Sequence, residues 1–258
     1  MSGPRTFVFL GTGTSVGVPM LGCDCPVCRS TNPKNHRYRT SALVYTPQGN
    51  ILIDTGPELR LQLLREQVKQ VHAVVYTHYH VDHLFGLDDL RLMARYLGGP
   101  MPIYCSQEVE EVIRRTFPYA FEERDVPLGW VPKLRFHRIS DEPFEVLGER
   151  IVPIPLIHSW FNVYGFRIGD LAYCTDVSEI PVKSWDLLEG VRILIIDALR
   201  YKPHPAHLSL DQALEVVERL RPEQAYLTHM SHEFDYAELQ PLLPGGVEMA
   251  YDGLRIMF

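Results

Sequence analysis

The feature that most constrains this sequence is the heptapeptide THYHVDH at residues 77–83, which holds three imidazoles and one carboxylate. It directly follows the short apolar run 73–76, which is typical of a buried strand. On a loop that leaves a strand, alternate residues such as His78 and His80 share one side, and the turn then brings the last two residues round to a neighbouring point. Imidazole and carboxylate ligands suit Zn²⁺, and Mn²⁺ or Fe²⁺ less strictly. The segment therefore predicts a metal site at the end of a strand.

Hydrophobic periodicity predicts alternating strands and helices that fold as one domain over residues 1–258. The strand-like runs gather in two halves with helices between them, which favours an α/β fold of two packed β-sheets flanked by helices. We expect a hairpin near the C-terminal end, with its turn at Asp252-Gly253. The expected strands are residues 6–10, 40–46, 51–54, 73–76, 103–105, 151–157, 164–168, 171–174, 191–196, 224–228, 247–251 and 254–257, and the expected helices are residues 57–69, 107–115 and 209–220.

Charge and apolar patterning disfavour two classes of partner. The formal net charge is −7 at pH 7, so no overall positive field draws in long nucleic acids. No stretch approaches the roughly 20 apolar residues of a membrane helix. The first apolar run ends at Gly11, which makes it too short for a secretory signal. We therefore expect a cytoplasmic protein with no membrane partner, in which thiols stay reduced.

Cys23, Cys25 and Cys28 lie close together in a glycine-rich loop. In a reducing compartment such clustering favours metal binding over disulfides. Three thiolates are one ligand short of a closed tetrahedral zinc site. The candidate fourth ligand is His232, three residues after His229, because a turn can point residues i and i+3 to opposite sides and so serve two metal sites. We predict a structural Zn²⁺ that pins the loop 11–28, and three unligated thiols are the alternative.

The pattern His-x-His-x-Asp-His after a short strand resembles the metal motif of the metallo-β-lactamase superfamily, and the resemblance covers nearly the whole chain. It implies an αββα sandwich of two mixed β-sheets flanked by helices, with two divalent metals, Zn²⁺ or Mn²⁺, in one site. The remaining ligands of the family pattern follow in order, each at the expected end of a strand. By this resemblance His78, His80 and His158 hold one metal, Asp82, His83 and His229 hold the second, and Asp176 bridges the two.

Two further carboxylates stand where this family supports its metal site from behind. Asp54 follows the apolar run 51–53, and Asp197 ends the apolar run 191–196. Hydrogen bonds from such outer groups orient metal ligands and tune their basicity. We predict that both carboxylates hold ligands rather than bind metal.

A narrower resemblance rests on three motifs together: the start Gly11-Thr12-Gly13-Thr14-Ser15, the Cys-x-Cys-x-x-Cys cluster and a late His-x-x-His pair. This combination is similar to the phosphodiesterase family of the phosphonate-degradation pathway, which opens cyclic ribose phosphates. It implies a catalytic histidine at the head of a late helix, where His207 stands, with His204 as the competing candidate. It also places Asp82 among the catalytic residues, as a metal ligand.

These features imply a metal-dependent phosphodiesterase that takes a small anionic phosphodiester, with His207 as the acid that protonates the leaving oxygen. Three alternatives stay open. They are an RNA-processing nuclease of the tRNA 3′-endonuclease type, a lactonase or thioesterase, and a non-catalytic metal-binding protein of pyrroloquinoline-quinone biosynthesis. The nuclease recognises tRNA with a long basic arm, and this sequence has no comparable basic insertion. A monomer and a homodimer are both compatible with the sequence.

Residues 117–136 are aromatic and proline-rich, without clear periodicity. Long irregular loops in compact domains are often functional, so a substrate lid is one interpretation. A surface loop packed by its own side chains is the other.

Overall fold

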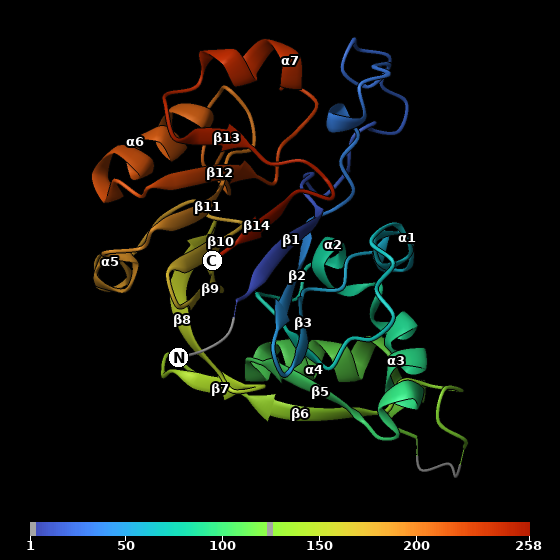
Figure 1. The fold of residues 1–258 in the computed structure, drawn as a ribbon. Helices are drawn as coiled ribbons and strands as arrows, with labels where there is room; N and C mark the ends of the chain where they lie inside the picture. Colours follow the sequence, from blue (N-terminus) through green and yellow to red (C-terminus); the bar gives the residue numbers. More distant parts are fainter. Residues whose placement is uncertain (1–3, 123–125) are drawn as a thin grey trace.

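Two seven-stranded sheets pack face to face in the computed structural model, which describes residues 4–122 and 126–258 (Figure 1). The first sheet has the strand order β14 (Arg255–Met257), β1 (Thr6–Gly11), β2 (Ser41–Thr46), β3 (Gly49–Ile53), β4 (Ala73–Val75), β5 (Met101–Cys105) and β6 (Leu134–Arg138). The second has the order β13 (Val247–Met249), β12 (Gln224–Thr228), β11 (Ile193–Asp197), β10 (Leu171–Cys174), β9 (Phe161–Ile168), β8 (Glu149–His158) and β7 (Phe144–Val146). The predicted architecture of two mixed sheets is confirmed.

Helices cover the outer faces of both sheets (Figure 1). None of the helices in the described part of the chain has the length and apolar composition that crossing a membrane requires. The α-helices are α1 (Leu59–Arg65), α2 (Val81–Leu84), α3 (Leu90–Leu97), α4 (Gln107–Thr116), α5 (Val182–Leu188), α6 (Leu210–Leu220) and α7 (Tyr236–Leu239), and short 3₁₀ turns lie at Pro33–Asn35, Leu87–Asp89, Pro118–Ala120 and Gln240–Leu242.

The direction of each strand determines at which edge of its sheet the strand ends. In the first sheet β3 and β4 are parallel. In the second sheet β10, β11 and β12 are parallel, and β8 runs the same way because both β8 and β10 are antiparallel to β9. Parallel strands end at one edge of their sheet, so the chain repeatedly returns to that edge at a carboxyl end.

Strand β1 shows how the sequence builds the core. Phe7 and Phe9 pack between the two sheets, whereas Val8 and Leu10 pack toward the helices that cover the first sheet. In the sequence, a strand that is buried on both faces appears as a continuous apolar run and not as an alternation of apolar and polar residues. The strand predicted over residues 6–10 is confirmed.

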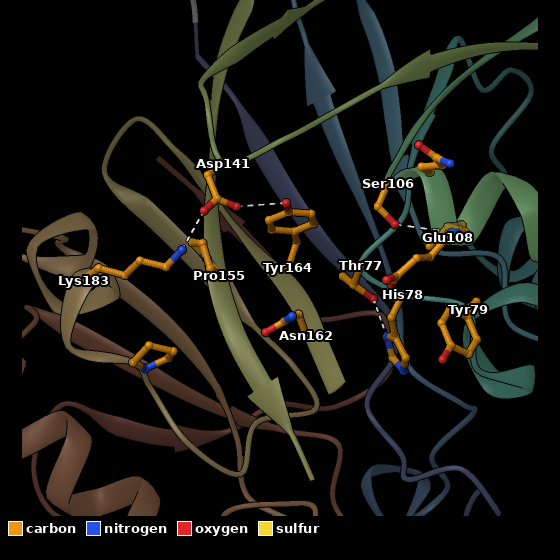
Figure 2. Close-up of a pocket in the computed structure, with 13 residues that line it drawn as sticks. Thr77, His78, Tyr79, Ser106, Glu108, Asp141, Pro155, Asn162, Tyr164 and Lys183 are labelled. Atoms are coloured by element: carbon orange, nitrogen blue, oxygen red, sulfur yellow. Dashed lines mark hydrogen bonds and ion pairs between the residues drawn. The ribbon is translucent and has the colours of Figure 1, made fainter. Parts of the chain in front are cut away.

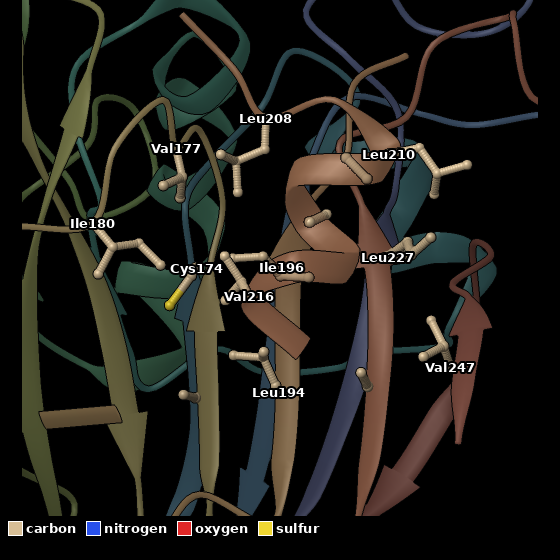
Figure 3. Close-up of a cluster of buried hydrophobic side chains, with 14 of the residues drawn as sticks. Cys174, Val177, Ile180, Leu194, Ile196, Leu208, Leu210, Val216, Leu227 and Val247 are labelled. Atoms are coloured by element: carbon tan, nitrogen blue, oxygen red, sulfur yellow. The ribbon is translucent and has the colours of Figure 1, made fainter. Parts of the chain in front are cut away.

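Helix α6 shows how a helix is held on the second sheet (Figure 3). Ser209 caps it, since its Oγ accepts from the N–H of Gln212 (3.3 Å) while the Gln212 side chain accepts from the N–H of Ser209 (2.9 Å). Leu210 and Val216 lie on the buried face, against the side chains of β10–β12. The helix predicted over residues 209–220 is confirmed.

The predicted C-terminal hairpin is wrong. Strand β13 pairs with β12 in the second sheet, with Ala225 opposite Val247, whereas β14 pairs with β1 in the first sheet. The turn at Asp252-Gly253 carries the chain from one sheet to the other, and the N–H of Gly253 donates to the carbonyl of Phe9 (2.8 Å). Each strand completes the edge of a different sheet instead of pairing with its neighbour in sequence. The local sequence pattern does not indicate which sheet has a free edge.

The helix predicted over residues 57–69 is shorter than expected, because α1 ends at Arg65 and Gln67 adopts a left-handed backbone conformation (φ 54°). Helices α3 and α5 and the edge strands β6 and β7 were not predicted. In the segment 117–136, Phe117 is buried and Phe121 stacks on Phe136 at 5.9 Å between ring centroids. Residues 123–125 of this segment lie outside the described residues, and its role as a lid stays a prediction.

Asp252 ties the crossover turn to the rest of the fold. Its carboxylate, 8% exposed, accepts from the N–H of Thr12 (2.9 Å) and of Tyr38 (2.8 Å), and lies 3.2 Å from Nη1 of Arg65. Burial raises the pKa of Asp252 to about 6, which shows how strongly this charge depends on its partners.

Changing Asp252 to Ala should therefore lower the free energy of unfolding by about 2–6 kcal/mol, since the N–H groups of Thr12 and Tyr38 lose their acceptor at about 1–3 kcal/mol each. Urea unfolding followed by circular dichroism measures the loss. The matched control is Asp170→Ala, whose exposed carboxylate forms a surface ion pair with Arg192, and it should leave the unfolding midpoint nearly unchanged. Equal midpoints for the two variants would contradict the anchoring role of Asp252.

Candidate metal centre

The seven predicted His/Asp ligands meet at the edge where the parallel strands end. His78 and His80 follow β4, Asp82 and His83 lie on α2, His158 ends β8, Asp176 follows β10 and His229 follows β12. Their ligand atoms form two sets, each within 4.8 Å of one another: His78, His80 and His158 in one, and Asp82, His83, Asp176 and His229 in the other. These are the sets that the family resemblance implies.

Asp176 lies between the two sets. Its Oδ2 is 3.1 Å from Nε2 of His83, and its Oδ1 is 3.3 Å from Nε2 of His229. The same Oδ1 lies 3.9 Å from Nε2 of His158, which belongs to the other set. One carboxylate therefore faces both groups of imidazoles, the arrangement that a bridging ligand requires.

The tautomers of three imidazoles follow from their hydrogen bonds. Nδ1–H of His158 donates to the carbonyl of Ala206 (2.7 Å), and Nδ1–H of His83 donates to Asp54 (2.7 Å). Because the Thr77 hydroxyl donates to Asp54 (2.7 Å), it accepts from Nδ1–H of His78 (2.9 Å). In the neutral form of each of these three rings, Nε2 carries the free lone pair, as in a metal ligand.

Buried imidazole nitrogens without hydrogen-bond partners indicate that these residues fit metal ions. Nε2 of His78, His83 and His229 is buried and has no hydrogen-bond partner among residues 4–122 and 126–258. Leaving a buried polar atom unsatisfied costs about 1–3 kcal/mol, so several such atoms aimed at one place call for a ligand. Imidazole and carboxylate donors suit Zn²⁺ or Mn²⁺, and the residues fit the predicted pair of divalent metals.

Asp54 hydrogen-bonds to a predicted ligand, His83, as expected, whereas Asp197 hydrogen-bonds to His207 and not to one of the seven predicted ligands. Besides its bonds with His83 and the Thr77 hydroxyl, Asp54 accepts from the N–H of Thr77 (2.8 Å). Asp197 Oδ2 accepts from the N–H of Val177 (2.9 Å) and from Nδ1 of His207 (2.9 Å). Sequence reasoning missed the roles of Thr77 and of the Ala206 carbonyl, and a backbone carbonyl leaves no mark in a sequence.

The backbone bends sharply at three of these strand exits. Asp54, Asp176 and His229 have φ angles of 63°, 57° and 57°, in the left-handed region that residues other than glycine seldom occupy. Asp and His tolerate it better than β-branched residues do, at a cost of the order of 1 kcal/mol each. The bend turns each side chain away from the strand direction and into the site.

Glycines allow α2 to approach the loop after β3. A Cβ on Gly86 would lie 2.2 Å from the carbonyl oxygen of Gly56, and a Cβ on Gly56 would lie 2.6 Å from that of Asp82. No side chain fits at either position without moving the backbone. The contact sets the position of Asp82 and His83 relative to the strands.

Charges in the site are mutually dependent. Burial holds the pKa of His78 well below its ordinary value, which keeps that imidazole neutral and able to bind metal. Burial opposes a charge on Asp176, but the imidazoles of His229 and His83 hold its pKa well below the ordinary value. Burial likewise opposes a charge on His83, yet the carboxylates of Asp176 and Asp82 raise its pKa well above the ordinary value. Positive charge is thus favoured at the centre of the site.

His207 lies against this cluster and is buried. Its ring centroid is 4.7 Å from those of both His158 and His229. Although burial opposes its protonation, Asp197 raises the pKa of His207 to about 9. His204 is half-buried, accepts from the N–H of Ala206 (3.2 Å) through Nδ1 and lies behind His207, at 5.3 Å between ring centroids. Of the two candidates, the structure places His207 in contact with the predicted ligands.

The cysteine loop forms a second candidate site. Nδ1 of His232 lies 3.2, 3.4 and 3.6 Å from Sγ of Cys23, Cys25 and Cys28. Ligand atoms about 2.3 and 2.1 Å from one tetrahedral Zn²⁺ would lie about 3.6 Å apart, so the set fits this ion. Two thiols also accept backbone N–H groups: Cys25 from Cys28 (3.4 Å) and Cys28 from Met20 (3.3 Å). The Cys28 contact lowers the pKa of Cys25 to about 6 and so favours its thiolate.

The turn 229–232 joins the two candidate sites. His229 faces the His/Asp cluster and His232 faces the cysteines, as the spacing of three predicts. The N–H of Met230 donates to the carbonyl of Thr12 (2.9 Å). The buried Arg37 donates to the carbonyls of Ser231 (2.9 Å) and Phe234 (2.7 Å). The glycine-rich loop and this turn therefore form one unit.

Changing Cys25 to Ser should remove one zinc per chain and lower the melting temperature, because structural zinc contributes directly to folding free energy. Elemental analysis with differential scanning calorimetry measures both. Asp24→Asn is the control, since this neighbouring side chain is 80% exposed and forms a surface ion pair with Arg29. Unchanged zinc content and melting temperature in the Cys25 variant would show that the cysteines bind no metal.

Comparison with known proteins identifies the family and the fold. The family described as beta-lactamase superfamily domain matches residues 49–230. A crystal structure of a diphosphatase from the PhnP family is 41% identical, with a TM-score of 0.94 over 100% of this chain and 98% of that one. Zn²⁺-bound PqqB from Methylobacterium extorquens is 18% identical, with a TM-score of 0.79 over 97% of this chain and 99% of that one, and shares the fold.

A curated protein, the octanoyltransferase of Porphyromonas gingivalis, is 36% identical over 252 residues. The match covers 96% of this chain but 50% of that protein, so the chain spans about half of its length. The family match extends over most of the residues that build the sandwich and the His/Asp cluster. This chain belongs to the metallo-β-lactamase superfamily.

Proposed function

We propose that this chain, a metal-dependent hydrolase, cleaves small phosphodiesters, among them cyclic ribosyl and nucleotide phosphates. One observation carries the proposal: a buried carboxylate, Asp176, faces two sets of imidazoles, and the buried imidazole of His207, which Asp197 holds, borders both sets. The resemblance to the PhnP family adds phosphonate breakdown as the metabolic role that we propose. The similarity to a diphosphatase supports phosphoryl chemistry in general.

Two divalent metals, Zn²⁺ or Mn²⁺, would be held by the seven His/Asp side chains, with Asp176 shared between them. When bound, they supply Lewis acidity that activates water and offsets the charge of the phosphate oxygens. A third ion, a structural Zn²⁺, would be held by Cys23, Cys25, Cys28 and His232. We assign Asp82 to metal binding and, through the metal, to catalysis, since its Oδ2 lies 3.4 Å from Nε2 of His83 and 3.7 Å from Nε2 of His229.

The protein's own contribution to bond cleavage is a proton for the leaving oxygen. Among the described residues His207 hydrogen-bonds through Nδ1 to Asp197, which leaves Nε2–H as the donor to a substrate. Asp197 fixes the ring and favours its protonated form, and Asp197 itself is held by the N–H of Val177. A positioned acid of this kind contributes typically about 10²–10⁴-fold to the rate.

The alternatives are less well supported by this arrangement. A thioesterase releases a thiolate, which needs no imidazolium of this kind, whereas a lactonase releases an alkoxide and is separated from a phosphodiesterase by its substrate. A non-catalytic metal-binding protein needs neither His207 nor a shared Asp176. A tRNA-processing nuclease shares the fold, but a formal net charge of −7 opposes the binding of long RNA. A small anionic diester is the partner that we propose.

Changing Asp176 to Asn should reduce hydrolysis of bis(p-nitrophenyl) phosphate by about 10²-fold or more, because the shared negative charge is lost. Elemental analysis of the same variant should find less metal than in the wild type, with the zinc of the cysteine site retained. Asp186→Asn, an exposed change, is the control and should keep both metal content and rate. Full activity in the Asp176 variant would refute the shared site.

The role of His207 depends on the leaving group. With bis(p-nitrophenyl) phosphate, which releases a stable phenolate, His207→Ala should cost little. With a 2′,3′-cyclic nucleotide, which releases a poor alkoxide, the same change should lower kcat by about 10²–10⁴-fold. His204→Ala serves as the matched control and should affect neither substrate. An equal loss on both substrates would mean that His207 positions phosphate or binds metal instead.

A further inference from the structure

An exposed tryptophan, Trp160, stands at the edge of the metal centre. It lies with Ser159 in the two-residue turn between β8 and β9, directly after the strand that ends in the predicted ligand His158. The residue is 87% exposed, although tryptophan is highly buried on average in folded proteins. The indole therefore contributes little to the core, and its surface is available to a partner from solution.

Trp160 is the outermost of three aromatic side chains that border the ligands. The ring centroid of Phe161 lies 5.1 Å from that of His158, and Tyr79 stacks on Phe161 at 5.9 Å. Figure 2 shows Tyr79 next to the ligand His78, with which it follows β4. The indole of Trp160 lies 6.0 Å from the ring of Phe161, at an interplanar angle of 73°. A row of rings thus leads from the metal centre outward to Trp160.

The turn that carries Trp160 is tied to the loop after β10. The N–H of Ser159 donates to Oγ of Ser178 (2.9 Å), and that hydroxyl donates to the carbonyl of Ile157 (3.0 Å). The N–H of Ile157 donates to the carbonyl of Glu179 (3.0 Å). These bonds order the end of β8 and the turn that follows. A ligand of the indole therefore meets a preorganised surface, which lowers the entropic cost of binding.

A flat aromatic group is the ligand that suits this surface. Aromatic side chains stack on nucleobases, and the stacking depends little on which base is present because every base has a π-face. The indole stands one ring beyond Phe161, and a nucleobase stands one sugar ring away from the phosphorus of a cyclic nucleotide. A cyclic nucleotide whose phosphate faces His158 would therefore have its base within reach of Trp160.

We propose that Trp160 is a specificity-determining residue, which stacks on the nucleobase of the diester and so favours nucleoside phosphates over diesters without an aromatic group. The inference rests on the proposed phosphodiesterase function and names the class of substrate within it. Because the stacking is the same in the ground state and the transition state, Trp160 should act on KM and leave kcat unchanged. Sequence reasoning had no signal for Trp160, since an aromatic residue in a strand-rich segment usually belongs to the core.

The test compares two substrates that share a cyclic phosphate and a leaving oxygen. They are adenosine 2′,3′-cyclic phosphate and methyl β-D-ribofuranoside 2′,3′-cyclic phosphate, in which a methoxy group replaces adenine. Rates are measured as the phosphate that an added phosphomonoesterase releases from the product. The wild-type protein should prefer the adenosine compound by about tenfold to a hundredfold in kcat/KM, the range of one stacked base.

Three variants assign this preference to the indole. Trp160→Ala should abolish it by raising KM for the adenosine compound, with both constants for the methyl riboside unchanged. Trp160→Phe should retain most of the preference, because a phenyl ring still offers a face for stacking. Met257→Ala is the matched control, since this apolar residue is 80% exposed and lies opposite Thr6 at the start of β1. It should keep the wild-type constants.

The outcomes separate this inference from the function on which it rests. Hydrolysis of neither cyclic phosphate would refute the phosphodiesterase function itself. Equal hydrolysis of the two compounds by the wild type, or a preference that survives Trp160→Ala, would overturn the inference and leave the function standing. An equal loss on both substrates, or a fall in kcat at unchanged KM, would make Trp160 a support for His158 and would likewise overturn the inference.

Discussion

The buried charge of Asp176 is the constraint on which the rest of this structure depends. A carboxylate enclosed between two sheets is strongly disfavoured unless positive charge faces it on every side. The imidazoles of His83, His158 and His229 surround it, and their free Nε2 atoms fit metal ions rather than each other. These ligands come from both sheets of the sandwich. The charges of the site therefore balance only when the two sheets pack together.

The sandwich meets this requirement through its strand directions. Within each sheet the strands that bear ligands run parallel, and each delivers one or two polar residues as it ends. At Asp54, Asp176 and His229 the backbone turns left-handed and redirects the side chain. The strain is local, while the apolar strands behind the site are fully buried and hold it in place. Rigid strands followed by sharp bends give a site whose geometry is set before any substrate arrives.

The cysteine loop has little apolar core of its own and depends on other interactions for its stability. Its own buried apolar cluster consists of Val18, Val27 and Cys28 alone among the described residues, too little to order a loop of this length. Four metal-binding side chains can supply what the core does not. Because the same turn carries His229 and His232, order in this loop is transmitted to the ligands of the His/Asp cluster. The two candidate metal sites are therefore joined through a few residues of backbone.

The sequence by itself predicted the fold family and both candidate sites, because the heptapeptide at 77–83 and the Cys-x-Cys-x-x-Cys cluster are local patterns whose chemistry admits few alternatives. The family resemblance added His158, Asp176 and His229, which the structure brings together with the heptapeptide. Apolar runs buried on both faces also identified most of the inner strands. Only the tertiary structure decided which sheet each C-terminal strand joins, since the pairing of β13 and β14 depends on free sheet edges far away in sequence. Only the structure placed the Thr77 hydroxyl and the Ala206 carbonyl in hydrogen-bond contact with ligands, because the Ala206 carbonyl comes from a distant segment and its contact depends on packing that no local pattern records.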